Sequence, residues 1–164
     1  MGVEIERKFL VTGEGWRAGA DAGVAIAQGY LSSEPRLSVR VRLKGERGFL
    51  TVKGAATGCT RSEYEYEIPS ADAAEMLRTL CLPEQIQKTR YHVPVGRHTW
   101  EVDVFHGANA PLVLAELELA SADEAYDRPA WLGAEVTDDP RYLNAQLAAN
   151  PYGSWAKSGR VGGT

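Results

Sequence analysis

Hydrophobic and polar residues alternate with a period of two along most of this chain. The stretch at residues 3–11 reads VEIERKFLV, with charged side chains at its even positions and mostly apolar ones at its odd positions. Because successive side chains of a β-strand point to opposite faces, this pattern predicts a strand with one charged and one apolar face. The same alternation predicts eight strands in all, at residues 3–11, 25–33, 37–44, 49–54, 61–68, 86–95, 99–106 and 112–119.

Helical composition replaces the alternation in three places. A helix is predicted over residues 71–80, and the capping-box spacing that starts at Ser121 predicts a short second helix that stops before Pro129. The last helix is expected over residues 141–149, with Pro140 at its first position. Helices are therefore few, and one of them is C-terminal.

Eight mostly consecutive strands with few helices indicate a mainly β fold of the α+β class. The strands are expected to form one antiparallel sheet closed into a barrel, because closure leaves no exposed edge strand. The length of 164 residues suits one domain with its own core. We expect this domain to span residues 1–150 and to be followed by a loose tail at residues 151–164.

The overall composition argues against several classes of partner. The formal net charge is −4, so there is no basic excess to attract a nucleic acid or an anionic membrane. The two cysteines do not make a disulfide framework. The N-terminus has no apolar signal-peptide core, and no segment approaches the roughly 18 apolar residues of a membrane helix. We therefore expect a cytoplasmic protein that binds neither nucleic acid nor membrane.

The polar faces of the predicted strands are unusual because one sign of charge dominates most of them. A solvated surface normally mixes signs, since like charges side by side repel each other. The basic rows are Arg40, Arg42 and Lys44; Thr51 and Lys53; and Lys88, Arg90 and His92. The acidic rows are Glu63, Glu65 and Glu67; Glu101 and Asp103; and Glu116 and Glu118, while the first strand carries Glu4, Glu6 and Lys8.

These rows indicate a binding site when they are taken together. Rows of Arg and Lys match the oxygens of a phosphate chain, and rows of carboxylates suit hard divalent cations. A barrel with both inside would hold a metal-bound phosphate chain between a basic and an acidic wall. Any one of these strands has the simpler interpretation of a solvated face. The repetition over seven of the eight predicted strands favours the site.

The residues also resemble a known family, the CYTH domain or triphosphate tunnel metalloenzyme family. Its signature ExExK is present as Glu4, Glu6 and Lys8. The resemblance runs in order from about residue 3 to residue 149. The further matching segments are QGYL (28–31), RVR (40–42), TVK (51–53), EYE (63–65), KTRY (88–91), EVDVF (101–105), ELE (116–118) and EVTDDPRYLN (135–144).

The resemblance implies an eight-stranded antiparallel tunnel that binds a triphosphate together with Mg or Mn. Members of this family include inorganic tripolyphosphatases, thiamine triphosphatases, RNA triphosphatases and class IV adenylyl cyclases. Short forms that begin EIERKFLV look most like the inorganic triphosphatases, so the expected activity is metal-dependent hydrolysis of tripolyphosphate. The alternatives are a nucleoside or thiamine triphosphatase, then an adenylyl cyclase, and then a non-catalytic module that binds polyphosphate or nucleotide.

The resemblance also assigns roles to individual residues. The metal-binding residues implied are Glu4, Glu6, Glu116 and Glu118, with Glu63, Glu65 and Asp103 as further ligands or supporting acids. The phosphate-binding residues implied are Arg40, Arg42, Lys53, Lys88 and Arg90. Lys8 and Tyr30 match a pair that acts near the scissile phosphate. Lys8 is either a base, if its pKa is depressed, or a plain phosphate ligand.

One departure from the family concerns the last helix. Similar enzymes can carry a lysine there, whereas this chain has Leu143, Ala145 and Gln146. Lys157 in the tail is a possible substitute. The contribution of this helix to phosphate binding is therefore open at the level of sequence.

Overall fold

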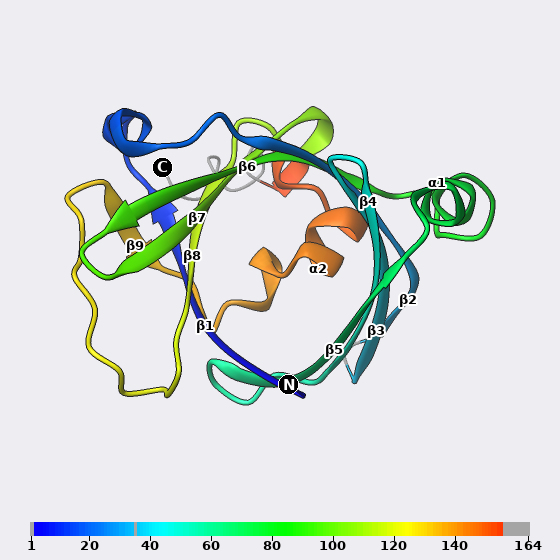
Figure 1. The fold of residues 1–164 in the computed structure, drawn as a ribbon, viewed down its shortest axis with the longest axis horizontal. Coiled ribbons are helices and arrows are strands. Elements are labelled where there is room, and N and C mark those ends of the chain that lie inside the picture. The colour runs from blue at the N-terminus through cyan, green and yellow to red at the C-terminus, as the bar shows by residue number, and fades with distance from the viewer. Residues whose placement is uncertain (1, 35, 156–164) are drawn as a thin grey trace.

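The computed structural model describes residues 2–34 and 36–155, which form one sheet wrapped around a central space (Figure 1). The strands are β1 (Val3–Val11), β2 (Val24–Glu34), β3 (Leu37–Lys44), β4 (Arg47–Gly54), β5 (Thr60–Ile68), β6 (Ile86–Val95), β7 (His98–Phe105), β8 (Val113–Glu118) and β9 (Leu132–Glu135). The helices are α1 (Ser70–Thr79) and α2 (Asn144–Ala149), with short 3-10 helices η1 (Gly15–Gly19), η2 (Gly107–Asn109) and η3 (Pro140–Tyr142).

Eight of these strands close into an antiparallel barrel, as predicted. Their order is β5-β4-β3-β2-β6-β7-β8-β1, and pairing of β1 with β5 joins the two ends. The short strand β9 was not predicted, and it adds to the free edge of β1. Most neighbours in the barrel are also consecutive in the chain, so short turns such as the one at Gly45, which has a positive φ of 61°, suffice to connect them.

The apolar faces of β1 and β6–β8 point outward and are covered. Phe9, Trp100 and Leu117 are buried there together with Trp16 of η1. Figure 1 shows η1 and the segment that precedes β9 on this outer side of the barrel. The cover removes aromatic surface from water, which allows the opposite faces of the same strands to be polar.

The inward faces change from charged to apolar along the barrel. On β8 the inward row runs from Glu116 to Leu114, and on β7 it runs from Asp103 to Phe105. At the apolar end these side chains pack with Leu147 of α2. The ribbon in Figure 1 shows α2 inside the ring of strands. The C-terminal helix therefore fills one part of the barrel and leaves a polar cavity beside it.

The last helix is shorter than predicted because the chain breaks at Leu143. Asp139 accepts a hydrogen bond from the Arg141 backbone N–H, and Pro140 starts the 3-10 helix η3 as a first-turn proline should. The carbonyl oxygen of Tyr142, however, accepts a hydrogen bond from Lys8 Nζ at 3.0 Å. This contact with β1 takes the place of a helical bond, so α2 begins only at Asn144.

Two further expectations differ from the structure. Residues 121–128 form a turn and loop rather than a helix, and Glu124 accepts a hydrogen bond from the Ala120 N–H at 2.6 Å instead of making the capping-box contact to Ser121. The Glu124 carboxylate also contacts His98, and Pro129 leaves little room for a helix to grow. In the segment expected to be a loose tail, Tyr152 and Trp155 pack against the apolar cluster around α2.

Residues 156–164 lie outside the described residues, so the suggestion about Lys157 falls outside them as well. Within the described ranges, no helix combines the length and the apolar character that a membrane span requires.

Candidate functional site: a charged cavity inside the barrel

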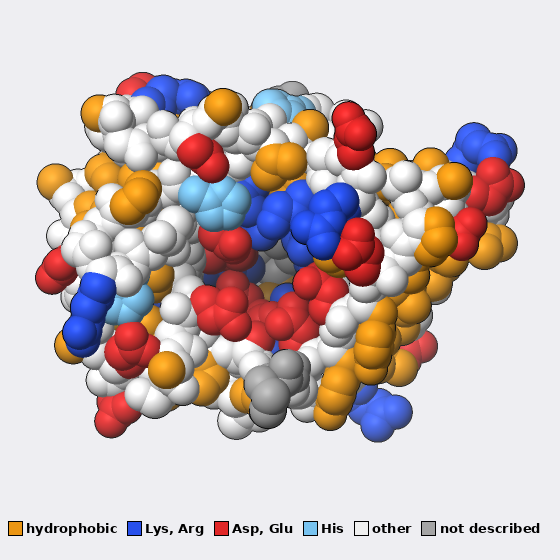
Figure 2. Space-filling model, in the orientation of Figure 1, with side chains coloured by type: hydrophobic (Ala, Val, Ile, Leu, Met, Phe, Trp, Pro, Cys, Tyr) orange, Lys and Arg blue, Asp and Glu red, His pale blue; other side chains and the backbone are white. Residues whose placement is uncertain are grey.

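A polar cavity of about 260 Å³ lies inside the barrel and opens to solvent. Figure 2 shows acidic side chains on one side of the opening and basic side chains on the other. Every residue predicted for the site except Asp103 lines this cavity. The lining residues predicted from the sequence are Glu4, Glu6, Lys8, Tyr30, Arg40, Arg42, Lys53, Glu63, Glu65, Lys88, Arg90, Glu116 and Glu118.

The acidic side of the cavity is built on β1 and β8. The register places Glu6 directly opposite Glu118, and neither carboxylate has an ion-pair partner among the described residues. Burial raises the pKa of Glu6, and the adjacent carboxylate of Glu4 raises it further. Burial and the charge of Glu6 likewise raise the pKa of Glu118. Two carboxylates face each other without a directly paired cation among the described residues, which is unfavourable in the absence of a ligand.

The basic side is built mainly on β3. Arg40 and Arg42 are both buried, and both approach Glu65 of β5, at 3.6 and 3.3 Å. Burial, together with the nearby charges of Arg40 and Arg90, lowers the pKa of Arg42 to about 10. One half-exposed carboxylate thus serves two guanidinium groups. The cationic wall repels itself as the acidic wall does.

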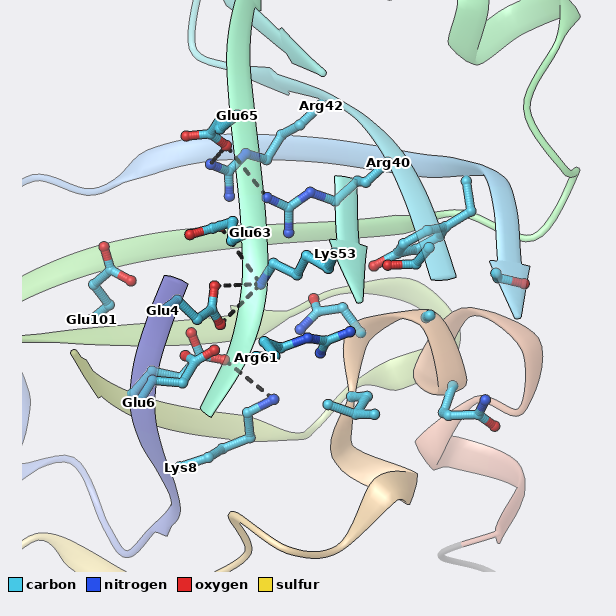
Figure 3. Close-up of a pocket in the computed structure, with 18 of the residues that line it drawn as sticks. Glu4, Glu6, Lys8, Arg40, Arg42, Lys53, Arg61, Glu63, Glu65 and Glu101 are labelled. Carbon is cyan, nitrogen blue, oxygen red and sulfur yellow. Dashed lines mark hydrogen bonds and ion pairs between the residues drawn. The ribbon is translucent and has the colours of Figure 1, made fainter. Parts of the chain in front are cut away.

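Lys53 joins the two sides of the cavity. Its Nζ lies 2.9 Å from Glu4 Oε1 and 3.8 Å from Glu63 Oε2. Figure 3 shows Lys53 reaching from β4 toward Glu4 and Glu63, with Arg61 below it. The Arg61 side chain lines the cavity and is held by a 3.1 Å hydrogen bond from its Nε to the carbonyl oxygen of Gly54.

A buried cluster on β6 and β7 supports the wall from behind. Asp103 is only 1 % exposed and accepts two hydrogen bonds from Arg90, at 2.8 and 2.9 Å. Its Oδ2 also lies 2.7 Å from Lys88 Nζ. Burial opposes the charge on Asp103, but Arg90 and Lys88 outweigh this effect and hold its pKa well below the usual range. Burial lowers the pKa of Lys88 to about 8.

Asp103 therefore holds a different place from the one expected of a metal ligand. It does not line the cavity, and its carboxylate oxygens are occupied by Lys88 and Arg90. Of the two roles that the sequence resemblance left open, this geometry favours the supporting acid over the ligand.

The predicted pair of Lys8 and Tyr30 is not joined by a hydrogen bond in the part of the chain that the structure describes. Lys8 Nζ contacts the Tyr142 carbonyl and, at 3.4 Å, Glu116. Burial alone would lower the pKa of Lys8, but Glu116 and Glu6 outweigh it, so the pKa is raised. A lysine in this state stays protonated at neutral pH. The surroundings favour a phosphate ligand over a base.

Several cavity-lining residues were not assigned a role from the sequence. Lys44 and Glu101 belong to polar rows that were recognised, and Arg61 extends the row of Glu63 by one alternation. The sequence pattern therefore contained a signal for these three. Asn144 on α2 also lines the cavity, and no strand alternation could have identified it.

Comparison with known proteins connects this geometry to a family. The model of the CYTH domain matches residues 2–149. The chain belongs to the CYTH domain family. An inorganic triphosphatase of Acetivibrio thermocellus is 49 % identical over 152 residues, which cover 93 % of this chain and 97 % of that protein. An inorganic triphosphatase of Nitrosomonas europaea is 40 % identical over 150 residues, covering 88 % and 96 %.

Solved structures show the same fold for this CYTH domain. The crystal structure of an inorganic triphosphatase matches at a TM-score of 0.61 and 37 % identity, covering 88 % of this chain and 96 % of that one. A Hippeastrum protein reported to have a dominant triphosphatase activity matches at a TM-score of 0.57 and 12 % identity, covering 74 % and 80 %. At this low identity the second match supports the fold alone.

Proposed function

We propose that this CYTH protein is an inorganic triphosphatase, which hydrolyses a phosphoanhydride bond of tripolyphosphate with the help of a divalent cation. The observation that carries the proposal is the pair of opposed walls, one acidic and one basic, across a single cavity. Each wall is destabilised by burial and by its own like charges, as the raised pKa of Glu118 and the lowered pKa of Arg42 indicate. A metal-bound phosphate chain would relieve both at once.

The acidic wall fits a hard divalent cation such as Mg or Mn by the chemistry of its donors. Carboxylate oxygens are the ligands that these ions prefer, and Glu6 and Glu118 are opposed without a cation. Among the described residues, no three acidic, His or Cys side chains already converge on one metal position. We propose that Glu4 and Glu116 complete the set once phosphate oxygens replace them as partners of Lys53 and Lys8.

The chain's own residues would position and neutralise the phosphate chain. Phosphoryl transfer depends on placement and charge stabilisation more than on covalent chemistry. Arg40, Arg42 and Arg90 would bind phosphate oxygens, and Lys8 would do so from the acidic side. A bound Mg or Mn ion supplies Lewis acidity and lowers the pKa of a coordinated water. Tyr30, which is 4 % exposed and lines the cavity, would contact the phosphate chain near the apolar end of the barrel.

A substrate panel tests the reaction class. Tripolyphosphate, pyrophosphate, ATP and thiamine triphosphate are each incubated with Mg or Mn, and orthophosphate, pyrophosphate and cyclic AMP are measured. We expect the fastest turnover with tripolyphosphate. Cyclic AMP formed with pyrophosphate from ATP would instead identify a cyclase, and saturable binding with no product would identify a non-catalytic module.

The Glu118→Gln variant tests the acidic wall. Glu118 has no ion-pair partner among the described residues. The change therefore removes the negative charge of a proposed metal ligand without breaking an ion pair to a lysine or arginine. We expect metal-dependent kcat/KM for tripolyphosphate to fall by at least about a hundredfold. The control is Glu67→Gln, because Glu67 pairs with Arg47 on the exterior and does not line the cavity. Equal activity in both variants would refute the metal site.

A further inference from the structure

The first residue of α2 contacts the basic wall from inside the barrel. Asn144 Oδ1 accepts a hydrogen bond from Lys88 Nζ at 2.9 Å and another from Gln28 Nε2 at 3.0 Å. Lys88 and Gln28 are almost fully buried, and they lie on neighbouring strands β6 and β2. The amide of Asn144 therefore links the C-terminal helix to two strands of the barrel at the floor of the cavity.

The contact with Asn144 helps to fix the direction in which the Lys88 ammonium group points its N–H donors. An ammonium group has three N–H donors in tetrahedral arrangement. One is directed at Asp103, whose Oδ2 lies 2.7 Å away, and one is directed at Asn144. When two donors are fixed, the direction of the third is fixed as well. Lys88 lines the cavity, and its Nζ has no third hydrogen-bond acceptor among the described residues, where the Phe105 ring centroid lies 5.4 Å away. The remaining donor is therefore available to an anion.

The composition of α2 limits how this helix can act on a bound phosphate chain. The helix reads NAQLAA and carries no charged side chain of its own. It therefore brings no side-chain charge to a phosphate chain, and its side chains can act on one through hydrogen bonds and through residues that they order. Gln28 donates a second hydrogen bond to Asn144 Oδ1, so this oxygen accepts from both Gln28 and Lys88.

We propose that Asn144 is a positioning residue for the proposed triphosphatase, and that it aims the third N–H of Lys88 at an oxygen of the bound phosphate chain. This inference rests on the proposed function. It assigns to the last helix a part in substrate binding that does not require a lysine. Asn144 acts through Lys88, so the loss of either residue removes the same interaction.

The test measures binding without turnover. Calorimetry with tripolyphosphate in EDTA gives a dissociation constant for the wild type, Asn144→Ala and Gln146→Ala. Gln146 is the matched control, because it is an amide on the same helix that lines the same cavity but makes no side-chain hydrogen bond among the described residues. We expect Asn144→Ala to weaken binding by about five- to tenfold and Gln146→Ala to leave it within about twofold.

A double-mutant cycle separates positioning from other roles. In a Lys88→Met background, Asn144→Ala should cause no further loss of binding, because the residue through which it acts is gone. An equal loss in both backgrounds would overturn the inference, and so would wild-type binding by Asn144→Ala. If the wild type binds tripolyphosphate only with a metal, the cycle is carried out with Mg and a non-hydrolysable imido analogue. Wild-type protein that binds neither ligand would refute the proposed function itself, which is a separate outcome.

The stability of each variant is checked by thermal unfolding before binding is measured. If Asn144→Ala does not fold, Asn144→Ser takes its place, since a serine hydroxyl is smaller and cannot reach both Lys88 and Gln28. The cycle is then carried out with this variant, and the same two results overturn the inference.

Discussion

The cationic side chains around the cavity differ in how buried their carboxylate partners are. This difference distinguishes ion pairs that stabilise the fold from ion pairs that can open to bind phosphate. Lys88 and Arg90 share Asp103, which is sealed behind them. Arg42 shares Glu65, which remains partly open to solvent. An incoming phosphate can replace an accessible carboxylate at little cost, whereas a buried one cannot leave without stranding its cations. Asp103 should therefore support the fold, and Glu65 should be exchangeable.

The Asp103→Asn variant tests this distinction through stability. Removing the buried charge leaves Lys88 and Arg90 without their shared counter-ion, so we expect the free energy of unfolding to fall by about 3–5 kcal/mol. Urea unfolding at neutral pH measures the change. Glu67→Gln, which alters an exposed ion pair with Arg47, should leave the unfolding curve unchanged. A stable Asp103→Asn protein would contradict the supporting role.

The same carboxylate gives a pH dependence with a definite sign. The pKa of Asp103 is lower in the folded protein than in the unfolded chain, where it is about 3.9. Its stabilising effect is therefore complete above that pH and is lost as the pH falls below it. Wild-type stability should decline steeply below about pH 4, and Asp103→Asn should lack this part of the decline. Parallel acid unfolding curves for the two proteins would count against the assignment.

The sequence could not predict which side chains of the site contact one another. Alternation predicted which side chains face inward, because strand geometry imposes a period of two. It could not predict that Lys53 pairs with Glu4 or that Lys88 and Arg90 cover Asp103, since these contacts depend on the order of strands around the barrel. Asn144 was beyond reach for the same reason, because its partners lie 56 and 116 residues away.

At the scale of elements, the barrel strands were predictable and the segments that contact them were not. The strands carry their own alternation, so their bounds agree with the prediction to within one or two residues. Strand β9 reads LGAE and is too short to show a pattern, so its pairing with β1 comes from tertiary context. The break before α2 has a similar origin, since Lys8 of β1 takes the carbonyl of Tyr142.

The contact between α1 and β4 can be tested with a pair of glycines. A Cβ at Gly48 would lie 2.8 Å from the Ala73 Cβ and 3.0 Å from the Ile68 carbonyl oxygen. We expect Gly48→Ala to push α1 outward and to lower the free energy of unfolding by about 1–3 kcal/mol in urea titrations. The cavity should be spared, so tripolyphosphate hydrolysis at low temperature should persist.

Gly54 provides the matched control on the same strand. A Cβ there would meet Ser62 Cβ at 3.5 Å, which is an ordinary contact. Gly54→Ala should therefore be neutral or raise the free energy of unfolding by about 0.4–1 kcal/mol, because alanine restricts the unfolded chain. Equal destabilisation by both substitutions would show that close packing of α1 is not the cause.

At the scale of the whole molecule, the closed barrel couples the two walls. The acidic wall lies on β1 and β8, and the basic wall lies mainly on β3, on the far side of the cavity. The net charge of −4 would repel a polyanion at a distance, so binding depends on the local concentration of cations inside. Each wall carries unrelieved repulsion, and a cation at one wall favours an anion at the other. Metal and phosphate chain should therefore stabilise the protein cooperatively.

Thermal unfolding with a non-hydrolysable imido analogue of tripolyphosphate measures this coupling. A ligand at 100 times its Kd stabilises the folded state by about 2.7 kcal/mol, which corresponds to a rise in Tm of roughly 5–10 °C for a chain of this size. We expect Mg and the analogue together to raise Tm by more than the sum of their separate effects, at constant ionic strength. This excess rise in Tm should vanish in Glu118→Gln, because the variant has lost one of the two opposed carboxylates of the acidic wall. Strictly additive shifts in the wild type would mean that the two walls bind their ligands independently, contrary to a shared metal-bound phosphate chain.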